Sequence, residues 1–192
     1  LDLQLILKKG ISDESPFILI QFANLLLIKL SLFRLARRLC TTALKIIENS
    51  DEKNHYEYQA KFIFAIFISR WLNSEQVVIS QLNDSVEACK DNNLITFATY
   101  SITQSIFTII GSGEKLDIIE KFIYKHNPYI YSVGFFDTIL TLEISKCFIS
   151  SLKNGTKTYK TSIFDEFESV KKMQLDGLTV PYGWYLCSKL KT

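Results

Sequence analysis

Glycine and proline are scarce in this sequence, and so are the residues that most often carry chemistry. Its 192 residues include seven glycines, three prolines, two histidines and four cysteines. A fold with many tight β-turns needs more glycine and proline, so their scarcity argues against an all-β protein. The cysteines lie far apart, and no two have the C-x-x-C spacing of a zinc or redox pair. We therefore expect buried, reduced thiols and no metal site.

A large excess of charge of either sign is also missing. The chain carries 22 Lys and Arg against 20 Asp and Glu, which gives a net charge of +2. This balance argues against nucleic-acid binding, which leaves a strongly basic footprint, and against an acidic disordered tail. No signal-peptide pattern is visible, and we expect a cytoplasmic protein.

Long uninterrupted apolar segments are missing as well. The best candidate for a membrane span, residues 16–33, contains Gln21, Asn24 and Lys29 and is barely long enough to cross a bilayer. A buried core helix explains this run better than a membrane span does.

The sequence does contain a regular alternation of long apolar helices with shorter, more charged ones. The long helices are predicted to begin near Pro16, His55, Leu94 and Pro128, which are 39, 39 and 34 residues apart. The predicted helix pairs cover residues 15–50, 54–91, 93–126 and 128–173, and a further pair begins over residues 181–192. This period predicts an all-α fold, an α-solenoid of stacked antiparallel helix pairs in one region, 1–192.

A stripe of small residues follows one side of the second predicted helix. Ala36, Cys40 and Ala43 are spaced four and three residues apart, so they share one helix face. Small side chains let a neighbouring helix approach closely. Ser85 and Ala88 align with the last two positions in the next pair. We predict a helix-packing stripe; the alternative is ordinary packing in which these residues fall together by chance.

The stripe resembles the second-helix pattern of tetratricopeptide repeats, although the helix pairs are longer than the ~34 residues of that family and lack its Trp and Pro markers. A longer stretch, from "FIFAIFISRW" through "SVEACKDNN" and "FATYS" to "EKLDII", resembles a helical region of large bacterial signalling proteins. In those proteins a serine/threonine kinase-like domain and a P-loop ATPase precede the helical repeats, and a sensor or histidine kinase part often follows.

This resemblance implies that the chain is the middle of a longer polypeptide. The kinase and ATPase motifs would then lie outside residues 1–192. The apolar segments at both ends, "LDLQLILKK" and "YGWYLCSKL", agree with this expectation, because the ends of a solenoid need polar caps.

No motif in the sequence predicts catalysis or a cofactor. "GSGEK" at residues 111–115 lacks the G-x-x-x-x-G-K-[ST] pattern of a phosphate-binding loop, because Leu116 follows the lysine. His55 and His126 have no second ligand at metal spacing. An all-α enzyme without a known motif would need two of His55, His126, Asp137 and Glu143 to meet in a cleft, and we expect that they do not.

Two groups of residues are candidates for a partner surface. Arg34 and Arg38 are one helical turn apart and could face an acidic partner, a nucleotide or RNA, although a solvated helix face explains them more simply. Tyr129 and Tyr131 belong to an aromatic cluster near Pro128, for which core packing is the simpler explanation.

Together these patterns predict a non-catalytic protein-interaction or sensing scaffold that uses no cofactor in this segment. Its partner would be a protein, a peptide or a neighbouring domain of the same chain. The alternatives are a free-standing helical adaptor and, less favoured, an all-α enzyme with no recognisable motif.

Overall fold

The computed structural model describes residues 4, 6, 8, 10–50, 55–155 and 158–191. Within these ranges all the regular secondary structure is helical, and no strand forms apart from an isolated bridge between Lys160 and Asp165. The all-α prediction is therefore confirmed. The chain divides into two compact units, Leu1–Ser105 and Ile106–Thr192, where the sequence predicts one continuous region.

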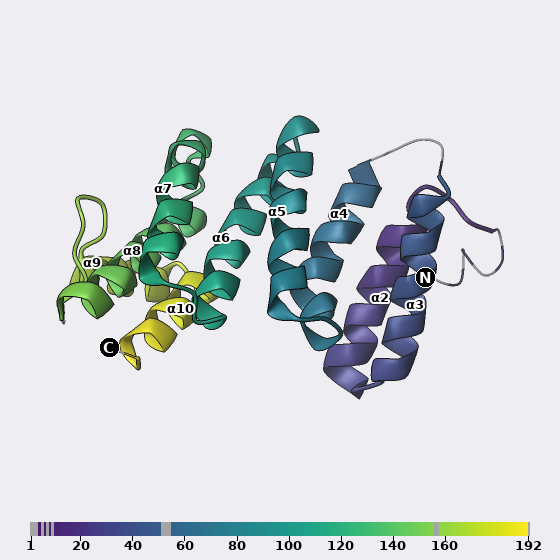
Figure 1. Ribbon diagram of the computed structural model, residues 1–192, viewed down its shortest axis with the longest axis horizontal. Helices are drawn as coiled ribbons and strands as arrows, with labels where there is room; N and C mark the ends of the chain where they lie inside the picture. Colours follow the sequence, from purple (N-terminus) through teal and green to yellow (C-terminus); the bar gives the residue numbers. More distant parts are fainter. Residues whose placement is uncertain are drawn as a thin grey trace. The chain divides into compact units, whose positions relative to one another are not determined.

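From residue 10 on, the described part of the first unit contains four complete α-helices, most of a fifth, and two short helical turns. In chain order they are α2 (Ser15–Leu30), α3 (Phe33–Glu48), α4 (His55–Ile63), a π-helical turn (Phe64–Ile68), a 3-10 turn (Ser69–Trp71), α5 (Glu75–Asp91) and α6 (Ile95–Gly111), as Figure 1 shows. Helix α2 packs against α3 and α4, and α4 packs against α5.

Helices α2 and α3 form a tight hairpin because two residues suffice to reverse the chain. Ser31 adopts the left-handed conformation with φ of 53°, and its N–H donates to the carbonyl of Leu27. Helix α3 is strongly amphipathic and buries Ala36, Cys40, Ala43 and Ile47. Helix α2 is apolar on most sides, which explains why it lies between α3 and α4.

The apolar segment after α4 departs from regular α-helix. Phe64–Ile68 forms a π-helical turn that buries Phe64, Ala65, Ile66 and Ile68. The hydroxyl of Ser69 donates to Oε1 of Gln81 at 2.5 Å and accepts from the side-chain amide of Asn73 at 2.9 Å. These bonds fix the end of the segment against α5. The sequence predicts one continuous buried helix here, and hydrophobic periodicity cannot reveal a single inserted residue.

The second unit contains α7 (Leu116–Val133), α8 (Phe136–Asn154), α9 (Glu166–Leu175) and α10 (Thr179–Lys189). Helix α8 packs against α7 and α10, and α9 packs against α10. Eleven residues of α8 are buried, including Glu143. Helix α8 is therefore the central helix of this unit, and its one buried carboxylate needs polar partners.

The fourth predicted helix pair begins at the wrong residue. Pro128 does not start a helix; it lies inside α7, which continues to Val133 and ends at Gly134, where φ is 76°. The fixed φ of proline is compatible with a helix, and Pro128 is exposed, so its ring meets solvent and only one backbone hydrogen bond is lost. The buried residues Ile119, Ile123, His126 and Ile130 keep helical spacing through the proline.

This correction changes the spacing of the long helices. Helix α8 begins at Phe136 and not at Pro128, α9 covers Glu166–Leu175, and the last helix begins at Thr179, two residues before Pro181. The starts of α2, α4, α6 and α8, at Ser15, His55, Ile95 and Phe136, are 40, 40 and 41 residues apart.

Candidate functional site

The predicted packing stripe of α3 lies in the core of the first unit. Ala36 and Ala43 are fully buried, and Cys40 is 1% exposed. Helix α2 is the main neighbour of α3. The two aligned residues of α5 behave differently from each other. Ser85 is buried and accepts a hydrogen bond from the hydroxyl of Ser101 at 3.2 Å, whereas Ala88 is only half-buried and lines a groove.

That groove has a volume of about 340 Å³ and lies in the first unit. Helix α3 contributes one residue, α4 contributes three, the π-helical turn contributes Phe64, and α5 contributes the other four. The lining residues are Leu44, Glu57, Tyr58, Lys61, Phe64, Gln81, Asp84, Ser85 and Ala88. We call it the α3–α4–α5 groove. Its size suits one or two side chains of a bound peptide.

The charged groups of the groove are two carboxylates and one lysine, beside the neutral polar side chains of Tyr58, Gln81 and Ser85. Glu57 is 6% exposed, and one of its carboxylate oxygens accepts from Nζ of Lys61 at 2.6 Å, one helical turn along α4. Asp84 is exposed on α5 at the edge of the groove. With Leu44, Phe64 and Ala88 the groove thus combines an apolar surface with two carboxylates and one lysine.

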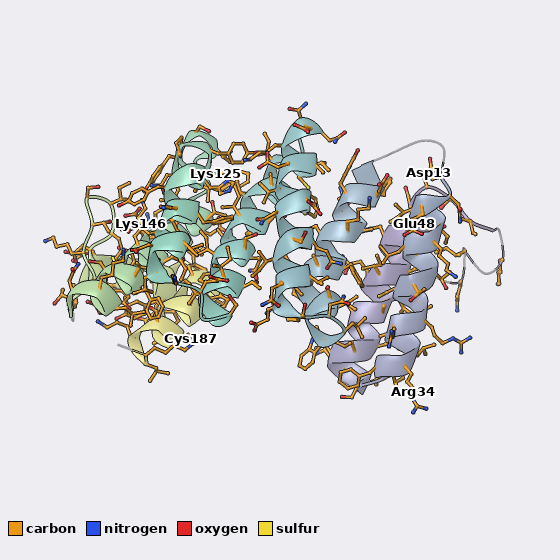
Figure 2. The ribbon with its side chains drawn as sticks, in the orientation of Figure 1. Asp13, Arg34, Glu48, Lys125, Lys146 and Cys187 are labelled. Carbon is orange, nitrogen blue, oxygen red and sulfur yellow. The ribbon has the colours of Figure 1, made fainter. Side chains whose placement is uncertain are left out.

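The second unit holds a buried cluster of polar side chains around Glu143, and its partner Lys146, also on α8, is labelled in Figure 2. Glu143 is 1% exposed. Its carboxylate accepts from Nζ of Lys146 at 2.7 Å, from the Tyr131 hydroxyl and from the Thr161 hydroxyl. Lys146 also donates to the Tyr131 oxygen at 2.8 Å.

The pKa values in this cluster all move away from neutrality. Burial by itself raises the pKa of Glu143, but the hydrogen bonds from Lys146, Thr161 and Tyr131 outweigh it, so the pKa lies below its ordinary value. Burial lowers the pKa of Lys146, but its bonds to Glu143 and Tyr131 outweigh it and raise the pKa. The pKa of Tyr131 is raised by burial and by Glu143.

An acid–base catalyst needs a pKa close to the working pH, so these shifts suit a permanent ion pair better than proton transfer. The cluster has a clear structural role. Through Thr161 it ties the loop after α8 to that helix, and the same hydroxyl accepts from the backbone N–H of Phe164 at 2.9 Å.

A second carboxylate holds the other side of this loop. Glu166 accepts from the backbone N–H of Tyr159 at 2.9 Å, from the Tyr185 hydroxyl at 2.7 Å and from Nζ of Lys189 at 2.8 Å. Lys189 also lies over the ring of Tyr159, 4.5 Å from its centre. Burial raises the pKa of Glu166, but these donors outweigh it and lower the pKa.

The remaining candidates of the sequence are spread over the molecule. Arg34 and Arg38 are exposed near the start of α3, and Figure 2 shows Arg34 at the end of that helix opposite Glu48. Tyr129 and Tyr131 are half-buried on α7, and only Tyr131 joins the Glu143 cluster. His126 is 2% exposed and packs against the ring of Phe122, with centroids 4.6 Å apart. The side chain of His55 lies outside the described residues.

Other sequence features are settled by the helix boundaries. "GSGEK" forms the turn between α6 and α7, so helices and no strand flank it.

Among the described residues, no group of three His, Cys, Asp or Glu side chains could hold a metal ion. In the same residues no helix is long and apolar enough to cross a membrane.

The sequence analysis missed the partners of Glu143 and the groove. A glutamate inside the apolar run "TILTLEISKCF", with Lys146 three residues later, was a signal for a buried ion pair. Tyr131 and Thr161 contact Glu143 from other segments of the chain, and no local sequence pattern predicts these contacts.

Comparisons with protein-family models, with curated proteins and with solved structures find no match. The resemblance to bacterial signalling proteins therefore stays a prediction.

Proposed function

We propose that this chain is a non-catalytic helical-repeat scaffold that binds a segment of a partner protein in the α3–α4–α5 groove. The observation that carries the proposal is the composition of this groove. It brings together apolar side chains from α3, the π-helical turn and α5 with the carboxylates of Glu57 and Asp84. Such a surface can hold an apolar side chain and pair with a neighbouring cation.

The spacing of the helices supports the repeat architecture. The starts of α2, α4, α6 and α8 are 40, 40 and 41 residues apart, a more regular period than the sequence analysis predicts. Each long helix is followed by a more polar one. This spacing and alternation support an α-solenoid whose tetratricopeptide-like pairs are longer than ~34 residues.

The groove determines the chemistry of the partner. Glu57 already pairs with Lys61, so a bound cation would face the exposed carboxylate of Asp84. We therefore propose a peptide segment in which Lys or Arg stands beside an apolar residue. Binding would partly bury the carboxylate of Asp84 and the cation of the peptide. A peptide without that cation would leave the carboxylate unpaired, so this contact contributes to specificity more than to affinity.

Selection from a library of random peptides on the immobilised chain tests this proposal. We expect the selected peptides to share a basic residue next to an apolar one. Asp84→Lys should lower their affinity by about tenfold, because it places like charges together. The matched control Asp176→Lys, which changes an exposed aspartate of the second unit, should leave the affinity unchanged. Enrichment of acidic peptides, or an equal loss in both variants, would contradict the proposal.

Two observations favour a scaffold over the enzyme alternative. The best-organised polar cluster, around Glu143, has pKa values displaced away from neutrality. It also ties down a loop, which accounts for its hydrogen bonds without a substrate.

The wider setting of the scaffold is part of the proposal. In a signalling protein that carries an ATPase and a kinase-like domain, peptide capture in the groove would bias the attached domains. Sequencing the reading frame on both sides tests this setting: an upstream G-x-x-x-x-G-K-[ST] motif after a predicted strand supports it, and a free-standing adaptor would lack one.

A further inference from the structure

The turn between α2 and α3 exposes an unusual set of apolar side chains. Connections between helices are ordinarily polar, but here Leu30, Leu32 and Phe33 are 57%, 44% and 45% exposed. Trp71, from the 3-10 turn after α4, is 60% exposed and meets Phe33 edge-on, with ring centroids 6.0 Å apart. We call Leu30, Leu32, Phe33 and Trp71 the apolar cap. It lies in the first unit and is separate from the α3–α4–α5 groove.

Cations surround the apolar cap in the sequence, and carboxylates are missing from the same segments. No Asp or Glu occurs in residues 15–47 or 62–74. Five exposed basic residues fall within these segments close to the cap: Lys29, Arg34, Arg37, Arg38 and Arg70. Among the ion pairs of the described residues, none involves any of the five.

Three arginines lie near the start of α3. Arg34 is in the first turn, where the partial charge of the backbone is positive and no acidic residue occurs, and Arg37 and Arg38 follow in the second turn. Figure 2 shows Glu48 at the opposite end of α3 from Arg34. The repulsion between arginine and the positive start of the helix lowers the stability of the isolated helix. An external anion bound at this end would offset that repulsion.

We propose that the apolar cap and its arginines dock this chain on the surface of an anionic lipid membrane. Leucine, phenylalanine and tryptophan side chains would enter the boundary between headgroups and acyl chains, where tryptophan is favoured. The arginines and lysine would pair with lipid phosphates just above it. The chain would lie on the membrane without crossing it.

An acidic protein surface is the competing partner, and the composition of the cap disfavours it. A protein interface of standard size needs hydrogen bonds of both kinds over about 800 Å² on each side. The cap offers exposed apolar atoms, and the five charged side chains near it in the sequence are all donors. A lipid surface supplies what these groups lack, namely hydrocarbon and a dense layer of anionic acceptors.

Vesicle flotation with a fluorescence readout tests the proposal. The chain has two tryptophans, and Trp184 stacks on Phe107 in the second unit. Trp184→Phe therefore leaves Trp71 as the only reporter. On vesicles that contain phosphatidylglycerol, we expect flotation, a blue shift of the Trp71 emission and quenching by brominated acyl chains. Vesicles of phosphatidylcholine alone should bind far more weakly.

Substitutions separate the contributions of charge and apolar contact. Replacing Arg34, Arg37 and Arg38 with Gln should weaken vesicle binding by about 100-fold, since each cation near the surface contributes roughly fivefold. The matched control replaces the exposed Lys121, Lys125 and Lys171 with Gln and should bind as the wild type does. Leu32→Ser, at an exposed turn position, should weaken binding by about tenfold. Urea unfolding verifies that each variant is folded.

Three results would overturn the proposal. One is the absence of flotation with anionic vesicles. Another is flotation in which the emission of Trp71 neither shifts nor is quenched, since this would indicate charge attraction alone. The third is tighter binding to immobilised polyglutamate than to the vesicles, which would assign the surface to an acidic protein.

Discussion

Glu143 and Lys146 form an ion pair one helical turn apart on α8, with the carboxylate 1% exposed and the two charged atoms 2.7 Å apart. A buried carboxylate without a cation would be costly, and Tyr131 and Thr161 supply the further donors that it needs. This cluster joins α7, α8 and the loop after α8. It therefore organises the second unit.

Removing the charge of Glu143 should destabilise the second unit. We expect Glu143→Gln to lower the free energy of unfolding by about 2–4 kcal/mol, because Lys146 loses its negative partner and an amide donor replaces one of the two oxygens that accept from the hydroxyls. Urea unfolding measures the change. The control is Glu87→Gln, which breaks an exposed pair with Lys90 at 3.7 Å and should change stability by less than about 0.5 kcal/mol. An equally small effect of Glu143→Gln would contradict the structural role of the cluster.

The contribution of Glu143 should also depend on pH with a definite sign. Its pKa is lowered in the folded chain, so the stabilisation is complete above its unfolded pKa of about 4.3 and is lost as the pH falls through the lower, folded value. The difference in stability between wild type and Glu143→Gln should therefore be constant near neutrality and shrink in acid. Urea midpoints of both proteins across this range measure it. A difference that grows in acid would show that the carboxylate is not held ionised.

Pro128 provides a test of where α7 ends. If α7 is continuous, Pro128→Ala restores a backbone donor in mid-helix at an exposed position and should stabilise the chain by about 1–3 kcal/mol. A helix that began at Pro128, as the sequence analysis predicts, would gain nothing from the change, since proline is well suited to the first position of a helix. Thermal or urea unfolding of the variant distinguishes the two boundaries.

The four cysteines should differ in reactivity. Burial raises the pKa of Cys40 to about 12; burial and the nearby carboxylates raise that of Cys147 to about 12, and burial raises that of Cys89. Cys187 is exposed on α10 and is labelled in Figure 2. Since the thiolate is the reactive form, a thiol reagent at pH 8 should modify one group quickly in the folded chain and four in urea. Cys187→Ser should remove the fast reaction; a fast phase that survives it would place another thiol at the surface.

The sequence was most informative where hydrophobic periodicity is strong and breakers are few. The all-α class and the buried positions of Ala36, Cys40 and Ala43 follow from local patterns. The prediction was wrong at Pro128. It relied on the general preference of proline for the first position of a helix, although the apolar residues keep helical spacing beyond Pro128. That spacing, from Ile119 through Ile123 to Ile130, was visible in the sequence and should have decided the boundary.

The candidate sites were less accessible from the sequence because they depend on contacts between distant segments. Glu143 meets Tyr131 and Thr161 only after α7, α8 and the loop are packed. The α3–α4–α5 groove combines residues as far apart as Leu44 and Ala88, and no local motif marks it. The apolar cap was partly visible as an acid-free segment, but the exposure of Leu32 and Phe33 is a property of the fold.

The affinity of a selected peptide for a variant with a filled groove tests the central claim most directly. Ala88→Trp places a large side chain in the α3–α4–α5 groove, at a half-buried position of α5. Gln76→Trp makes the same addition at an exposed position of α5 outside the groove. Fluorescence anisotropy of a labelled peptide should show a loss of at least about tenfold for Ala88→Trp and no loss for Gln76→Trp. Equal affinities for both variants would show that the peptide binds elsewhere and would contradict the proposed function of the groove.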